Sequence, residues 1–244
     1  MRNVWIIAQR EIAGYFSTPL AYVFLVIFLA AAAAVPFFFG GFFESRQADL
    51  TSFFGFHPWL LLVLVPAIGM RLWAEERRLG TIEILMTMPV TIWQAVLGKF
   101  LAAWLFTGLA LALTFPMWVT VNLLGEPDNG VILASYFGSF LVAGALLSLA
   151  AAVSAGTKSQ VIAFVLSVSA GFLLVVAGLD FALSFVRQWA PQYVVDLIAS
   201  FSILTHFLTI TKGMLDLRAL VFFGSLIVLF LFINKEVVAL KKAA

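Results

Sequence analysis

The sequence predicts an all-helical membrane protein with a single domain, residues 1–244, and six membrane-spanning helices. Hydrophobic residues make up 64% of the chain and charged residues only 11%, against about 45–50% and about 25% in soluble domains. Several apolar stretches carry no charge, the longest being the 32 residues Ile12–Phe43. Phe (26) and Trp (7) are abundant, which suits a lipid-facing surface with interfacial aromatic residues. Lipid is therefore the expected solvent.

The spans follow from the stretches that lack Lys, Arg, Asp and Glu, because a spanning helix needs about 20 mostly apolar residues. The last charge-free run, Ala219–Asn234, has only 16 residues, but apolar residues follow it. A further stretch, Leu197–Thr211, has 15 residues, which is closer to an interfacial or re-entrant helix than to a span. The predicted spans cover approximately residues 20–42, 57–74, 100–122, 132–154, 161–179 and 218–235.

The orientation follows from Lys and Arg, which accumulate on the cytoplasmic side of membrane proteins. With six spans and the N-terminus inside, the cytoplasmic segments hold ten of these residues and the outer segments hold four. Making Leu197–Thr211 a seventh span would move the Lys-rich C-terminal tail outside. The charge distribution therefore favours six spans with both termini in the cytoplasm.

Residues 1–18 differ from the spans because Arg2, Arg10 and Glu11 alternate with apolar residues such as Trp5 and Ile6. This pattern predicts a helix that lies in the membrane interface. The alternatives are a basic flank of the first span or a signal peptide. The apolar stretch is too long for a signal peptide, and its loss would leave five spans and a broken charge pattern.

The outer segment Asp180–Arg218 is long, mixes apolar with polar residues and is interrupted by Pro191. It predicts two short helices that dip toward the membrane from outside, before the last span. The other two outer connections are short and acidic, with Glu44 and Asp49 in one and Glu126 and Asp128 in the other.

The densest charge lies between the second and third spans, in residues 71–99. Glu75 to Arg78 would extend the second span into water as a charged turn. Gly80 permits a left-handed stop, and Thr81 is a candidate N-cap for a following helix. In that helix Glu83 would lie in the first turn, where the helix dipole favours an anion.

Residues 82–88 would form this short, mostly apolar helix, which Pro89 ends, and Thr91 can cap the approach to the third span. Such a projecting helix offers a grip to a partner protein. The alternative is an ordinary charged loop that satisfies the positive-inside rule.

Catalytic and ion-coupling signatures are missing from the sequence. The predicted span midplanes carry no ionisable residue, although proton- and ion-coupled carriers use such residues. There is no P-loop, no GxSxG elbow and no HExxH motif, and Cys is absent. The two histidines, His57 and His206, lie far apart and near predicted outer surfaces, where a lone His is usually interfacial. The chain is not expected to be an enzyme, and a partner must supply any energy.

The charged segment resembles the coupling-helix signature of ABC-2 type transporter permeases, and the match is closest to the gliding-motility-type and related small permeases. Two weaker similarities accompany it: the N-terminal segment around Arg10 and Glu11 resembles the elbow helix of that family, and residues 207–218 resemble its approach to the last span. The residues that carry the first similarity are Glu75, Glu76, Gly80, Thr81, Glu83, Leu85, Pro89 and Val90, followed by Gly98 and Lys99.

The resemblance implies an ATPase-coupling role for six residues, an elbow helix beside them and a smaller second cytoplasmic contact in the loop 156–160. It also implies residence in the bacterial inner membrane. The residues concerned are Glu75, Glu76, Gly80, Thr81, Glu83 and Pro89 for coupling, Arg10 and Glu11 for the elbow, and Lys158 for the second contact.

The resulting expectation is the membrane-spanning half of an ABC transporter, with export as the direction that the resemblance favours. ATP and Mg²⁺ would bind to a separate ATPase, and this chain would hold no cofactor. The expected partners are that ATPase, a second permease subunit that is identical or paralogous, and the lipid bilayer, with an extracytoplasmic accessory protein as a further candidate and no nucleic acid. The alternatives are a permease-like scaffold that transmits ATPase energy to an envelope machine without moving cargo, an intramembrane enzyme, or a channel.

Overall fold

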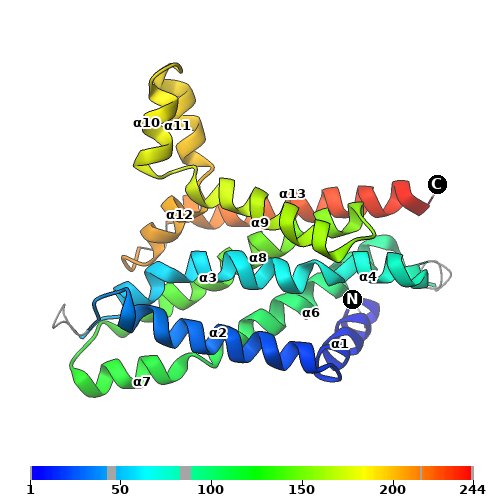
Figure 1. Ribbon diagram of the computed structural model, residues 1–244, viewed down its shortest axis with the longest axis horizontal. Coiled ribbons are helices and arrows are strands. Elements are labelled where there is room, and N and C mark those ends of the chain that lie inside the picture. The colour runs from blue at the N-terminus through cyan, green and yellow to red at the C-terminus, as the bar shows by residue number, and fades with distance from the viewer. Residues whose placement is uncertain (1, 43–47, 83–88, 215, 243–244) are drawn as a thin grey trace.

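The computed structural model describes residues 2–42, 48–82, 89–214 and 216–242, and every structural statement below concerns these residues. Within them the regular secondary structure is helical throughout and no strand occurs. The long helices lie roughly side by side in one elongated bundle (Figure 1). The predicted all-helical class is therefore confirmed for the described part of the chain.

The helices follow the predicted order, with some boundaries moved. The charged turn follows the second apolar helix directly, with Met70 as the one residue between them. The third apolar helix begins about eight residues earlier than expected. The helices are α1 (Arg2–Phe16), α2 (Pro19–Phe38), α3 (Thr51–Gly69), α4 (Arg71–Leu79), α6 (Ile92–Ala112), α7 (Phe115–Leu124), α8 (Asn129–Gly156), α9 (Gln160–Val176), α10 (Asp180–Arg187), α11 (Gln192–Ser200), α12 (Ile203–Ile210) and α13 (Leu217–Lys242).

Five helical segments are long and apolar enough to cross a membrane: Ala21–Phe38, Thr51–Leu79, Ile92–Leu124, Asn129–Gly156 and Leu217–Leu240. Two bent pairs, α9 with α10 and α11 with α12, raise the number to seven if each pair is one span. The chain thus has the helices of a multi-pass membrane protein, and the count of six spans stays a prediction.

Helix α8 lies at the centre of the bundle and packs against α3, α4, α6, α9, α12 and α13. The C-terminal half of α8 is rich in buried small residues, including Ala143, Ala145, Ala150 and Ala151. A Cβ at Gly69 of α3 would lie only 2.5 Å from the Cβ of Ala150. Small residues at these positions let helix backbones approach closely, as they do between helices in membranes.

The two ends of the bundle differ in what they carry. One end holds α1, the end of α4, the α8–α9 connection and the C-terminal end of α13, while the α7–α8 connection and α12 lie at the other end (Figure 1). The first and the last helix therefore reach the same end of the bundle, and its cytoplasmic orientation stays a prediction. The short helices α10 and α11 project sideways from the bundle (Figure 1).

His57 corrects one expectation, because the sequence analysis treats it as an interfacial residue. Its side chain is fully buried within α3, and its Nδ1 lies 2.8 Å from the Ser139 hydroxyl of α8. Phe53, Phe54 and Tyr136 surround the ring. The helix begins at Thr51, six residues earlier than predicted, so His57 lies inside the bundle and not at its edge.

Candidate functional site

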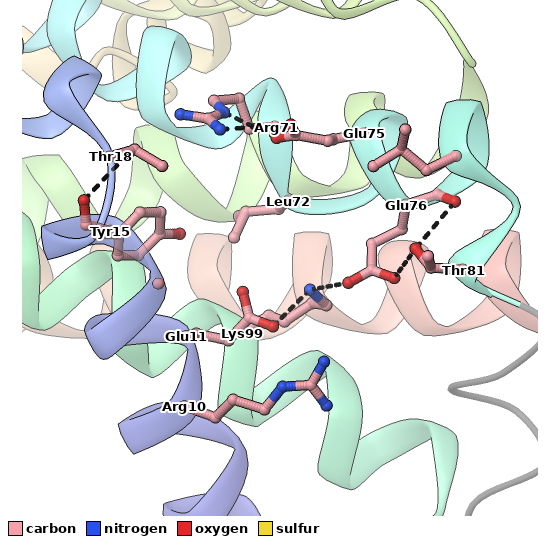
Figure 2. A pocket seen from close by; sticks show the side chains of 12 residues that line it. Arg10, Glu11, Tyr15, Thr18, Arg71, Leu72, Glu75, Glu76, Thr81 and Lys99 are labelled. Atoms are coloured by element: carbon pink, nitrogen blue, oxygen red, sulfur yellow. Dashed lines mark hydrogen bonds and ion pairs between the residues drawn. The ribbon is translucent and has the colours of Figure 1, made fainter.

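Three helices that are distant in sequence meet at a buried lysine. The ammonium of Lys99 on α6 lies 2.8 Å from a carboxylate oxygen of Glu11 on α1 and 2.9 Å from one of Glu76 on α4. Figure 2 shows the ammonium between the two carboxylates. These charge-assisted hydrogen bonds join the predicted elbow helix, the charged extension of the second span and the start of the third.

Lys99 is unusual because its side chain is only 3% exposed. A buried ammonium requires anionic partners, since desolvation otherwise disfavours its charge. The Trp73 ring adds a further contact, with the ammonium 5.7 Å from the ring centroid. The preceding residue, Gly98, lets α1 come close, because a Cβ there would lie 2.7 Å from Ile7 Cγ2. The Gly98–Lys99 pair therefore combines a close helix crossing with a central cation.

The end of α4 folds back onto the same cluster. Gly80 adopts the left-handed conformation, with φ of 74°, which a residue with a side chain adopts at a cost. This turn brings the Thr81 hydroxyl within 2.7 Å of the second carboxylate oxygen of Glu76, to which it donates. Both oxygens of Glu76 are thus hydrogen-bonded, one to Lys99 and one to Thr81.

The N-terminal end of α4 is capped from another helix. The Ser154 hydroxyl of α8 accepts hydrogen bonds from the backbone N–H groups of Trp73 and Ala74, at 3.2 and 3.0 Å, and donates to the Met70 carbonyl at 2.8 Å. The first N–H groups of a helix have no partner within it, so Ser154 supplies one. Arg77 adds a bond of 2.7 Å to the Ala155 carbonyl. Helix α4 is therefore fixed to α8 as well as to α6.

A cavity of about 280 Å³ opens beside the cluster, between α1 and α4. The ion pair of Arg71 and Glu75 lies on its wall, 2.8 Å apart and one turn apart on α4. The exposed Arg10 also lines it. Burial raises the pKa of the Tyr15 hydroxyl well above its ordinary value, and the Glu11 carboxylate raises it further, so Tyr15 stays neutral in this wall.

The structure brings together only part of the predicted coupling set. Glu11, Glu76 and Thr81 belong to the buried cluster and Gly80 makes its turn, whereas Glu75 pairs locally with Arg71. Thr91 caps the start of α6, as predicted, and the Gln94 side chain completes a capping box by accepting from the Thr91 N–H.

The remaining predicted residues lie at the edge of the site or beyond what is described. Pro89 is exposed, two residues before the Thr91 cap. Lys158 is exposed in the connection from α8 to α9, beside α4. Glu83 and most of the predicted helix 82–88 lie outside the described residues, as do the backbone groups that Thr81 would cap.

The sequence indicates no role for Ser154 or Arg77, and none for Lys99 beyond its place at the end of the motif that carries the resemblance. Lys99 was counted as the charged boundary of a span, although a Gly-Lys pair at such a boundary is also what a close, buried helix crossing requires. Ser154 gives no local signal, because its partners Trp73 and Ala74 lie about 80 residues earlier in the chain.

Comparison with known proteins gives no match, either to a protein-family model or to a curated protein. Among the described residues, no group of three or more His, Asp or Glu side chains is arranged to hold a metal ion. The site therefore has to be interpreted from its geometry, which is that of a structural junction between three helices at one end of the bundle.

Proposed function

We propose that the chain is the membrane-spanning subunit of an ABC-2 type transporter, an exporter, which receives mechanical work from a separate ATPase through residues 75–91. The observation that carries the proposal is the Glu11–Lys99–Glu76 cluster, which joins α1, α4 and α6 at the point where this segment leaves the bundle. A partner protein that binds this segment would therefore move three helices together.

A push on the segment would be transmitted through the contacts of α4. Movement of α4 away from α6 would separate Glu76 from Lys99 and leave the buried ammonium with Glu11 as its one carboxylate partner. Losing a charged hydrogen bond of this kind costs about 1.5–3 kcal/mol. Ser154 and Arg77 resist movement of α4 against α8 as well. The lower-energy response is a tilt of the connected helices as one unit.

The proposed partners follow from the same reasoning. The ATPase would bind ATP and Mg²⁺ and would contact Glu83 and Pro89, with Lys158 as a second contact and Arg10 at the edge of the cavity. A second permease subunit would complete the pathway through the bacterial inner membrane. The scarcity of ionisable residues in the spans supports an external source of energy.

The test is ATP hydrolysis by the purified complex in lipid. The tagged chain is purified from its own cells in mild detergent, and any ATP-hydrolysing subunit that remains bound is identified and assayed after reconstitution. We expect an ATPase to co-purify. Glu83→Arg should release it, and Glu76→Gln should lower hydrolysis severalfold while the permease remains monodisperse.

The matched control is Asp216→Asn, which changes an exposed carboxylate at the other end of the bundle and should leave hydrolysis unchanged. Recovery of the intact chain without an ATP-hydrolysing subunit, or equal behaviour of Glu83→Arg and Asp216→Asn, would refute the proposal. The charged segment would then serve only to orient the protein in the membrane.

A further inference from the structure

Helices α10 and α11 form a projecting hairpin, residues 180–200, which we call the paddle. Its two helices pack against each other, and Leu183 and Val195 are their buried residues. The paddle extends away from the bundle at a steep angle to the long helices (Figure 1), and α10 is bent by 79° from α9. Most of its surface therefore does not contact the rest of the described chain.

Both paddle helices carry the same pattern of side chains. Aromatic or aliphatic residues recur every four positions, which places them in one stripe along each helix. The polar residues precede them by one position and form a second stripe. The first apolar stripe is Phe181 and Phe185 on α10 with Trp189 two residues after it, and the second is Tyr193 and Leu197 on α11 with Phe201 just after it; all are between 51% and 84% exposed. The polar stripes are Asp180, Ser184 and Gln188, and Gln192, Asp196 and Ser200.

The two apolar stripes lie on one broad face of the paddle. Each stripe is offset in the same direction from the buried side of its own helix, which faces the other helix. In an antiparallel pair the helices are related by a two-fold axis perpendicular to the plane of the hairpin, and this operation keeps equivalent stripes on the same face. The paddle thus has one aromatic face and one polar face.

The base of the paddle is fixed rather than free. A Cβ at Gly178 would overlap the Thr205 and Ser202 hydroxyls, so the chain leaving α9 lies directly against α12. On the other side, His206 Nε2 donates to the Ser200 carbonyl at 2.9 Å. The His206 ring stacks on Phe222 with centroids 4.1 Å apart. These contacts set the direction in which the paddle projects.

The length of α9 sets the depth of the paddle in a membrane. Its 17 residues begin at Gln160, beside α4, and cover about 25 Å at about 1.5 Å per residue. The hydrocarbon core is about 30 Å thick. The paddle therefore leaves the bundle near the interface opposite the charged cluster, and the 79° bend turns it into the plane of the bilayer.

We propose that the paddle lies at the membrane–water interface on the non-cytoplasmic side of the membrane, with its aromatic face in the lipid acyl region and its polar face in water. An element with one apolar and one polar face at this depth matches an interfacial helix. Trp189 and Tyr193 flank the tip, and such residues favour the headgroup level. The paddle acts as a lateral anchor that fixes the tilt of α9 and α12.

The paddle's charges make the attachment independent of lipid charge. The charged residues of the paddle are Asp180, Asp196 and Arg187, so its net charge is small and negative. Anionic headgroups therefore offer no attraction. Insertion should be equally deep in zwitterionic vesicles and in vesicles containing phosphatidylglycerol, at low and at high salt.

The absence of cysteine from the chain allows the test to be made on the full-length protein. Phe185→Cys and Leu197→Cys place one thiol on the aromatic face, and the adjacent Ser184→Cys and Asp196→Cys place one on the polar face as matched controls. Each variant is labelled with an environment-sensitive fluorophore and reconstituted in phosphatidylethanolamine–phosphatidylglycerol vesicles. Quenching by lipids with a nitroxide on the acyl chain is compared with quenching by iodide in the buffer.

We expect labels at positions 185 and 197 to show a severalfold higher ratio of lipid to iodide quenching than labels at 184 and 196. Iodide quenching on both faces would overturn the proposal, because the paddle would then project into water. Protection of positions 185 and 197 from both quenchers, with thiol cross-links between two copies of the chain, would also overturn it and would assign the face to a subunit contact. Neither result depends on an ATPase, so this proposal and the proposed function can fail separately.

Discussion

Replacing Lys99 by Met tests whether the buried cluster holds the three helices together. Met keeps most of the aliphatic volume but removes the ammonium that Glu11 and Glu76 share at 2.8 and 2.9 Å. The two carboxylates are about one fifth exposed, so they would face each other with little water. Removing one partner of a buried pair costs about 3–5 kcal/mol, and this is the expected loss in the free energy of unfolding.

The assay is thermal unfolding of the purified chain in mild detergent, followed by tryptophan fluorescence, to which Trp73 beside Lys99 contributes. For a chain of this size each kcal/mol lowers the unfolding temperature by about 2–4 °C, so the expected shift is about 6–20 °C. Arg71→Met is the control, because its pair with Glu75 is local and partly exposed. Such a pair contributes about 0.3–0.5 kcal/mol, or about 2 °C at most.

A rescue experiment separates the loss of charge balance from a simple loss of packing. In the triple variant Glu11→Gln, Glu76→Gln and Lys99→Met no charge remains buried, and replacing a buried ion pair by neutral groups is often close to neutral for stability. We expect this variant to regain most of the unfolding temperature lost by Lys99→Met alone. If Lys99→Met unfolds within about 2 °C of Arg71→Met, the cluster is not a junction and the reasoning is wrong.

Three further variants test other contacts by the same unfolding assay. Ser154→Ala removes the cap of α4 and should lower the free energy of unfolding by about 1–3 kcal/mol, because buried N–H groups lose their acceptor. Its control is Ser148→Ala, which removes a buried hydroxyl that donates within its own helix and should cost about 1 kcal/mol or less. Gly98→Val should cost about 1–3 kcal/mol by overpacking the crossing of α1 and α6, and proteolysis of α1 should be faster. Gly224→Ala is the control, because a Cβ at that position would enter open space. Equal stability of these two variants would refute the prediction. Gly178→Val should displace the paddle from α12 and lower the lipid quenching at its aromatic face, whereas unchanged quenching would show that the base does not direct the paddle.

Much of the helical layout could be predicted from the sequence because lipid imposes a simple rule, a long apolar stretch between charges. The same rule explains the errors at the ends of the spans. It finds where charge stops rather than where a helix begins, so the third span was expected from residue 100, directly after Lys99, although the helix begins at Ile92. The break near Thr114 within the third apolar segment has no charge to mark it.

The candidate site was predictable only in its local part. Gly80 and Thr91 could be predicted because a left-handed glycine and a helix cap act on residues within a few positions. Lys99 and Ser154 act on residues 23 and about 80 positions away, and nothing in one sequence pairs such positions. Glu11 was assigned to the elbow by resemblance, but its link to Lys99 could not be seen, because charged residues at span ends are ordinarily read as topological signals.

The distribution of polar contacts divides the chain into two ends that can respond differently to force. At the charged end, the ammonium of Lys99 on α6 binds Glu11 of α1 and Glu76 of α4, and Ser154 joins α8 to the start of α4. A small displacement of α4 must therefore carry α1 and α6 with it, because otherwise charged hydrogen bonds of about 1.5–3 kcal/mol each are lost. At the other end, α9 and α12 are joined to the paddle through Gly178 and His206. If lipid holds the paddle, tilting at the charged end meets a fixed point at the opposite interface. The helices between the two ends, chiefly α3, α8 and α9, then have to change their packing.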